Sequence, residues 1–178
     1  MQSVTQWFTD EQRMRHNTKA MKRRNGFTLV ELLVTIAVLV VLIGIGVPSF
    51  RSVVQDNRLV TTANSLVRSM NVARSEALER GREVTLQPQS GTDWESGWEV
   101  WSDTDDNGSQ DADEIIQTIG APDGAVSISG GPDEVVYEPS GLTTTNGCFD
   151  ITDSGSSAAR NVDVSPTGRA SAGTGSCP

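Results

Sequence analysis

An apolar run from residue 27 to residue 47 is the feature that most constrains the fold. These 21 residues carry one charged side chain, that of Glu31. About 20 apolar residues suffice for a helix to cross the hydrocarbon core of a bilayer. Residues 27–48 are therefore predicted to form a transmembrane helix in contact with lipid. A cleaved secretory signal fits less well, because its apolar region spans only about 7–15 residues and ends at a small-residue cleavage site.

Charge is divided unevenly on either side of this run. Residues 1–26 hold six Lys or Arg and two acidic residues, whereas residues 27–178 hold eight Arg, no Lys and 21 acidic residues. The positive-inside rule places the basic segment in the cytoplasm and the acidic body on the far side of the membrane. A net charge of −13 on the body argues against a nucleic-acid partner, since phosphate contacts need Lys and Arg.

The order of residues at the start of the run is specific. Basic residues are followed by Gly26 and then by "FTLVELL", which resembles the leader of type IV pilins and pseudopilins. This resemblance implies that a prepilin peptidase cuts between Gly26 and Phe27 and that Phe27 is then N-methylated. Residues 1–26 would be the leader peptide, with Met21 as a possible alternative start.

Glu31 needs an explanation, because a carboxylate in a spanning helix costs roughly 2.5–3.5 kcal/mol on insertion scales. The resemblance implies that Glu31 guides filament assembly by neutralising the N-terminal amine of a neighbouring subunit. The alternative is a tolerated acid near the membrane interface, which its side chain reaches by snorkelling.

The pattern beyond the run predicts an α+β fold. Residues 49–81 show apolar positions at helical spacing and end at Gly81, a typical C-cap, so an amphipathic helix is expected. Residues 82–178 contain short β-type runs separated by Gly, Pro, Asp and Ser, which indicates a β-rich head. A long N-terminal helix, half transmembrane and half amphipathic, would pack on an antiparallel sheet. The tryptophans at 94, 98 and 101 are expected mainly in its core.

Several later segments resemble the general secretion pathway protein H and FimT family of minor pseudopilins. They are "NVARSEALERG", "GWEVWSDTDDNGSQDADEII", "EPSG" and "RNVDVSPTGR". The resemblance implies a type IV pilin-like fold and a structural subunit of the type II secretion pseudopilus. A minor pilin of a type IV pilus is the alternative. Other pseudopilins or minor pilins, the prepilin peptidase and the inner-membrane assembly platform would be partners. The head would be periplasmic on a single-pass inner-membrane anchor.

A function of another class is DNA binding for natural transformation, which some FimT-like minor pilins perform with a basic motif near the C-terminus. The corresponding stretch here is "GRASAG", where Arg169 has no second arginine close by in sequence. Arg169 is therefore the candidate DNA contact, in a body whose negative charge argues against this activity.

The segment "DTDDNGSQDADE" fits the calcium-loop pattern D-x-[DN]-x-[DN]-G-x5-E. Oxygen ligands at this spacing can surround one hard cation. The six candidate ligands are Asp103, Asp105, Asn107, Ser109 through its carbonyl, Asp111 and Glu114. A structural calcium ion is one interpretation, although the flanks indicate strands and not the helices of an EF-hand. An acidic hairpin tip without a metal is the other.

Cys148 and Cys177 are the only cysteines, and their spacing fits neither a zinc ribbon nor a C-x-x-C motif. In an oxidising compartment they would form one disulfide, whereas in a cytosolic domain they would be two free thiols. Residues 27–178 contain no His and no Lys, which removes most general bases and nucleophile activators. No enzymatic activity and no required cofactor are expected.

Overall fold

The computed structural model describes residues 26–178, and the chain divides into two compact units, Met1–Leu42 and Ile43–Pro178. Helix α1, Leu29–Arg80, runs through both segments that were expected to be helical and continues through Pro48. It begins two residues later and ends one residue earlier than the predicted ranges 27–48 and 49–81. It ends at Gly81, which has a φ of 66° and donates a 3.0 Å hydrogen bond to the carbonyl oxygen of Ala77. Gly81 is therefore the C-cap that the sequence predicts.

Eight strands follow the helix, one for each β-type run of the sequence. They are β1 (Val84–Ser90), β2 (Asp93–Trp101), β3 (Ile115–Gly120), β4 (Val126–Gly130), β5 (Val135–Tyr137), β6 (Gly147–Asp153), β7 (Ala159–Val164) and β8 (Ala170–Thr174). All the pairings between them are antiparallel. The α+β class and the antiparallel head are thus confirmed.

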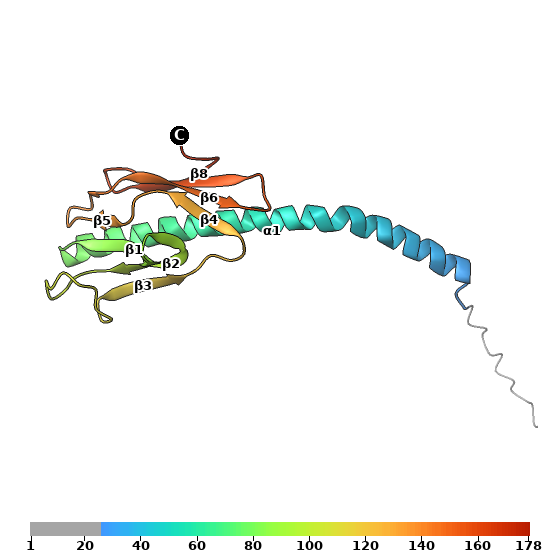
Figure 1. Cartoon of the computed structure of the whole chain (residues 1–178), viewed down its shortest axis with the longest axis horizontal. Coiled ribbons are helices and arrows are strands. Elements are labelled where there is room, and N and C mark those ends of the chain that lie inside the picture. Colours follow the sequence, from blue (N-terminus) through green and yellow to red (C-terminus); the bar gives the residue numbers. More distant parts are fainter. Residues whose placement is uncertain (1–25) are drawn as a thin grey trace, which may run out of the picture. The chain divides into compact units, whose positions relative to one another are not determined.

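The head contains two four-stranded sheets where the sequence led us to expect one. One sheet has the order β3-β2-β1-β5, and the other has the order β4-β6-β7-β8 (Figure 1). The chain changes sheet three times, since β4 joins the second sheet, β5 returns to the edge of the first beside β1, and β6 enters the second sheet again. Such pairings depend on residues far apart in sequence, so strand-forming runs alone do not reveal them.

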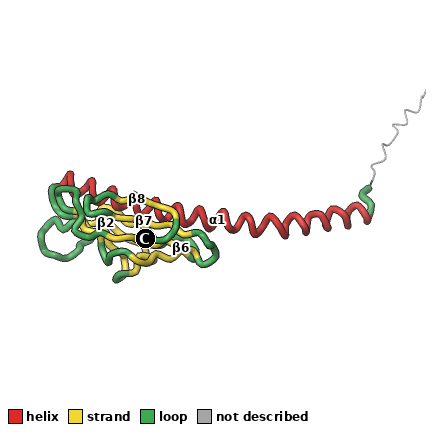
Figure 2. Tube along the Cα trace, turned by 90° about the horizontal axis from the view of Figure 1, so that it is seen from above, coloured by secondary structure: helices red, strands yellow, loops and turns green. Residues whose placement is uncertain are grey.

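The core of the second unit lies between the C-terminal half of α1 and both sheets (Figure 2). The helix buries one stripe, made up of Leu59, Thr62, Ala63, Leu66, Ser69, Met70, Ala73 and Ala77. Trp94 joins the two sheets by packing edge-on against Phe149, with 5.0 Å between ring centroids. Trp98, which is 1% exposed, donates a 2.9 Å hydrogen bond from its indole nitrogen to the Ser69 hydroxyl. Trp94 and Trp98 are therefore core residues, whereas Trp101 is half-buried.

Candidate functional site

The N-terminal end of α1 is closed by its own side chains. Thr28 directly precedes the helix, and its hydroxyl oxygen accepts a 3.2 Å hydrogen bond from the backbone N–H of Glu31. Thr at the N-cap with Glu three residues later is the pattern of a capping box. The Glu31 carboxylate also lies in the first turn, where the helix dipole favours negative charge. Glu31 therefore has a role in starting its own helix, in addition to any role between subunits.

The residues around the expected cleavage site are accessible. Gly26 and Phe27 lie outside regular secondary structure, and the Phe27 side chain is 82% exposed. The large apolar side chains that follow, from Leu29 onward, are exposed as well. Helix α1 is long and apolar enough to cross a membrane, with a mean hydropathy of 2.8 in its most apolar window. The rest of the expected leader, including Met21, lies outside the described residues.

The acidic segment forms the connection between β2 and β3. Asp103, Asp105 and Glu114 each bring a carboxylate oxygen within 4.8 Å of the others. Asp103 accepts hydrogen bonds from the backbone N–H groups of Asn107 and Gly108, at 3.2 and 2.8 Å. Gly108 has a φ of 73°, which suits the sharp turn that the sixth position of a calcium loop requires. Three of the six expected ligands are thus gathered around one point.

The other three expected ligands are arranged differently. The Asn107 side-chain nitrogen donates to Asp105 at 2.9 Å and to Asp111 at 3.0 Å, so its amide nitrogen faces the carboxylates. A rotation of the Asn107 amide group by about 180° would direct its oxygen, in place of its nitrogen, toward these carboxylates. The Asn107 side-chain oxygen accepts a hydrogen bond from the N–H of Ser109. The loop is folded by its own hydrogen bonds, and a cation would replace those that involve the Asn107 side chain.

Two carboxyl groups of this loop are held in their charged form by backbone donors. The N–H of Gly108 lowers the pKa of Asp103, with a further contribution from Asn107. The N–H of Thr104 lowers the pKa of Glu114, and Asp111 contributes in the same direction. Glu114 is only 3% exposed, and both of its carboxylate oxygens accept hydrogen bonds. Both groups are therefore preorganised as anions.

The structure contains the predicted disulfide between Cys148, in β6, and Cys177, near the C-terminus. The N–H of Cys177 also donates a 2.7 Å hydrogen bond to the Asp150 carboxylate. Asn161 donates to the carbonyl oxygen of Ser176 at 3.2 Å. The N–H of Gly175 donates a 2.9 Å hydrogen bond to the carbonyl oxygen of Ala159. The last residues are thus fixed to β6 and β7 by one covalent bond and three hydrogen bonds.

Arg169, the candidate DNA contact, is an exposed residue just before β8. In the β7–β8 pairing, Val164 lies opposite Ala170, whereas Arg160 lies opposite Thr174. Arg160 and Arg169 therefore occupy opposite ends of this pair of strands. The arrangement does not gather the basic charges of the C-terminal region at one point.

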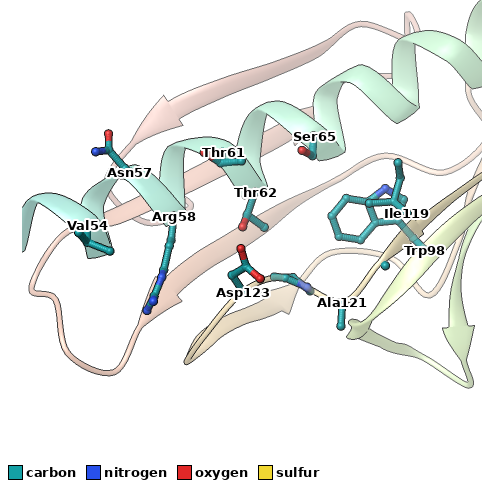
Figure 3. A pocket seen from close by; sticks show the side chains of 12 residues that line it. Val54, Asn57, Arg58, Thr61, Thr62, Ser65, Trp98, Ile119, Ala121 and Asp123 are labelled. Atoms are coloured by element: carbon teal, nitrogen blue, oxygen red, sulfur yellow. The ribbon is translucent and has the colours of Figure 1, made fainter. Parts of the chain in front are cut away.

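A cleft between α1 and the C-terminal end of β3 was missed by sequence analysis. It has a volume of about 570 Å³. It is lined by Val54, Asn57, Arg58, Thr61, Thr62, Ser65, Trp98, Ile119, Gly120, Ala121, Pro122 and Asp123. Figure 3 shows Arg58 extending from the helix toward the β3–β4 connection, and the Asp123 side chain directed toward the helix near Thr62. The sequence signal that could have indicated the cleft is Arg58, which lies next to the buried stripe of the helix. The opposite wall of the cleft, residues 119–123, comes from a distant part of the chain.

Comparison with known proteins identifies the family. The family model of type II transport protein GspH matches residues 62–168, which is more than half of the chain. The prokaryotic N-terminal methylation motif matches residues 21–47. No curated protein matches the chain.

Two solved proteins share the fold. The type IV minor pilin FimU of Pseudomonas aeruginosa is 20% identical, with a TM-score of 0.57, over 69% of this chain and 97% of the FimU chain. The minor pseudopilin EpsH from the Type 2 Secretion System of Vibrio cholerae is 14% identical, with a TM-score of 0.52, over 66% of this chain and 97% of the EpsH chain. Together with the matched family model, the helix-and-two-sheet head and the methylation motif establish that this chain belongs to the GspH family of pilin-like proteins.

Proposed function

We propose that the protein is a minor pseudopilin, a structural subunit of the pseudopilus in a type II secretion system. The observation that carries this proposal is a GspH-type head on the same chain as an N-terminal methylation motif. The protein acts by assembly, and its role is structural and not catalytic.

The first step is processing of the leader. A prepilin peptidase cuts after Gly26, and the new terminus at Phe27 is methylated. The helix begins two residues later, at Leu29, so the new amine lies four residues before Glu31, slightly more than one helical turn. The Thr28 cap keeps this end helical while the amine of a neighbouring subunit approaches Glu31. The two charges neutralise each other in lipid, where either one alone is costly.

The second step is docking beside other subunits from the inner membrane. The basic leader segment keeps the N-terminus in the cytoplasm, and the acidic head is periplasmic. Exposed apolar residues of α1 contact lipid first and neighbouring helices afterwards. Other pseudopilins and the inner-membrane assembly platform are the partners.

The experiment combines intact mass with copurification. The full chain is coexpressed with and without a prepilin peptidase, in cells that also produce the other pseudopilins. We expect a product beginning at methylated Phe27 only with the peptidase, and recovery of that product with other subunits. In Glu31→Gln, we expect normal cleavage and loss of copurification. An uncut chain under both conditions, or a cut chain that never joins other subunits, would contradict the proposal.

A type IV pilus minor pilin is the second candidate, and the likeness of the fold to FimU favours it. The two roles predict different phenotypes. In the first case, deletion of the gene should abolish protein secretion. In the second case, deletion should abolish pilus assembly and leave protein secretion intact.

We also propose that the loop of residues 103–114 binds one structural calcium ion. The gathered carboxylates of Asp103, Asp105 and Glu114 support this, as does the turn at Gly108. Extracellular calcium modules bind with dissociation constants of about 10⁻⁴–10⁻³ M. Millimolar calcium should raise the Tm of the full chain, and a chelator should reverse the change. The response should disappear in Glu114→Gln and persist in the control Asp133→Asn, an exposed acid outside the loop. A Tm that does not change when calcium is added would contradict the proposed calcium site.

A further inference from the structure

The cleft between α1 and β3 has a polar wall and an apolar floor. Arg58, Thr61 and Ser65 face it from the helix, whereas Trp98 and Ile119 line it from the sheet. Trp98 and Ile119 are directly paired across β2 and β3, so their side chains share one face of the sheet. The cleft therefore offers apolar surface and charge within one space, and peptide-binding sites likewise combine side-chain pockets with Arg groups that recognise acidic motifs.

Arg58 is the charged group with unused binding capacity. Its side chain is half-buried, and its guanidinium lies against the backbone of Gly124, where any larger residue would displace it. Within the described residues, neither an ion pair nor a hydrogen bond joins the Arg58 guanidinium to another group. A guanidinium has five N–H donors in a planar fork that matches a carboxylate. A carboxylate supplied from outside the chain is the complementary partner.

The shape of the cleft favours an extended segment. Strand β3 is an edge strand, so no further strand of this sheet lies on its outer side. The backbone N–H and C=O groups on that side are free to pair with an added strand. Ile119 and Gly120, at the end of β3, belong to the cleft as well. A segment that enters beside β3 can thus use backbone pairing and still reach Arg58.

We infer that this cleft docks an extended, acidic segment of a neighbouring subunit of another kind. A carboxylate of that segment pairs with Arg58, and an apolar side chain next to it packs on the half-buried Ile119. Asp123, exposed on the facing wall, repels segments that carry a second acid at that point. This inference rests on the proposed assembly function and adds the chemistry by which one partner is chosen.

The test is site-specific photo-crosslinking in cells that produce the complete set of pseudopilins. A photoreactive phenylalanine analogue replaces Thr61 in the full chain, since Thr61 is exposed and lines the cleft. The crosslinked peptide is identified by mass spectrometry. We expect a segment of a different subunit with an Asp or Glu near the attachment point. Arg58→Glu should reduce the crosslink about tenfold, because a charge-assisted hydrogen bond is replaced by repulsion.

Three further variants make the result specific. Arg68→Glu is the matched control, since Arg68 is exposed on the same helix outside the cleft, and its crosslink yield should match the parent's. Ala121→Trp fills the cleft without changing charge and should also abolish the crosslink. Replacing the captured carboxylate by Arg should restore crosslinking in Arg58→Glu.

The outcomes separate this inference from the proposed function. A chain that copurifies with the other subunits but gives a crosslink insensitive to Arg58→Glu would overturn the inference alone. Crosslinking to lipid or to a second copy of this chain would do the same. A chain that fails to copurify with any subunit would overturn the proposed function, and the inference with it.

Discussion

Arg74 donates a 3.0 Å hydrogen bond from its side-chain Nε to the carbonyl oxygen of Gly141, a residue 67 positions later. Gly141 ends the segment "EPSG", and Gly168 belongs to the segment "SPTG". A Cβ on Gly168 would overlap the carbonyl oxygen of Gly141 and lie close to Arg74. Two short motifs that are separate in the sequence thus meet at one arginine of α1.

This contact predicts that Gly168→Ala destabilises the head. Gly168 has a φ of 76°, and Gly81 is a matched control because its φ is 66° and open space surrounds it. Gly81→Ala should lose only the left-handed backbone strain, about 1–2 kcal/mol. Gly168→Ala should lose about 1–3 kcal/mol more, because the turns at Gly141 and Gly168 are forced apart. The measurement is the free energy of unfolding of the full chain in detergent. Equal losses in the two variants would contradict the prediction.

The disulfide predicts a second loss of stability. The double variant Cys148→Ser, Cys177→Ser should lose about 3–4 kcal/mol, because the unfolded chain is no longer closed into a loop of about 30 residues. Treatment of the parent protein with a thiol reductant should give the same loss, which serves as the control. Limited proteolysis should then cut after β8, since only hydrogen bonds with Asp150, Ala159 and Asn161 still hold the tail. A tail that stays protected in the double variant would show that those hydrogen bonds suffice.

Local pattern was enough to predict the elements of this fold. The helical spacing ended at Gly81 and each β-type run became a strand, because a helix cap and a strand depend on neighbouring residues. The disulfide could be predicted because only two cysteines exist. The calcium pattern correctly indicated that Asp103, Asp105 and Glu114 come together, but it did not reveal that the Asn107 amide nitrogen faces Asp105.

Long-range arrangement could not be predicted in the same way. The division into two sheets depends on β5 pairing with β1, across about 50 residues of intervening chain. The cleft needs Arg58 from the helix and Asp123 from the β3–β4 connection, and no spacing in the sequence relates these two residues. The cap that the Thr28 hydroxyl supplies to α1 was also missed, because the resemblance to pilins drew attention to the role of Glu31 between subunits.

The hydrogen bond between Trp98 and Ser69 predicts a third effect on stability. Ser69→Ala leaves the buried indole N–H of Trp98 without an acceptor, which should cost about 1–3 kcal/mol. Ser75→Ala, at an exposed position of the same helix, is the control and should be neutral or slightly stabilising because Ala favours helix. Chemical unfolding followed by tryptophan fluorescence gives both values. If the two variants unfold alike, the hydrogen bond contributes nothing measurable.

Tyr137 predicts an alkaline limit to stability. Burial raises the pKa of Tyr137 to about 12 from an ordinary value of 10.0, against a smaller lowering by Arg74. The folded head thus disfavours tyrosinate, whereas the unfolded chain accepts it. The free energy of unfolding is therefore unaffected by Tyr137 below pH 10.0 and falls as the pH rises toward 12. The total loss should be up to about 3 kcal/mol. Tyr137 is the only tyrosine of the chain, so tyrosinate absorbance follows this group alone.

Tyr137→Phe is the matched variant for this prediction. The Tyr137 hydroxyl is buried without a hydrogen-bond partner among the described residues. Its removal should therefore leave stability at neutral pH unchanged or higher, because no polar group has to be desolvated. Between pH 10 and 12, the free energy of unfolding should fall much less in the variant than in the parent protein, since the Phe side chain cannot ionise. A titration of the folded parent protein near the ordinary tyrosine pKa would instead mean that water reaches the hydroxyl.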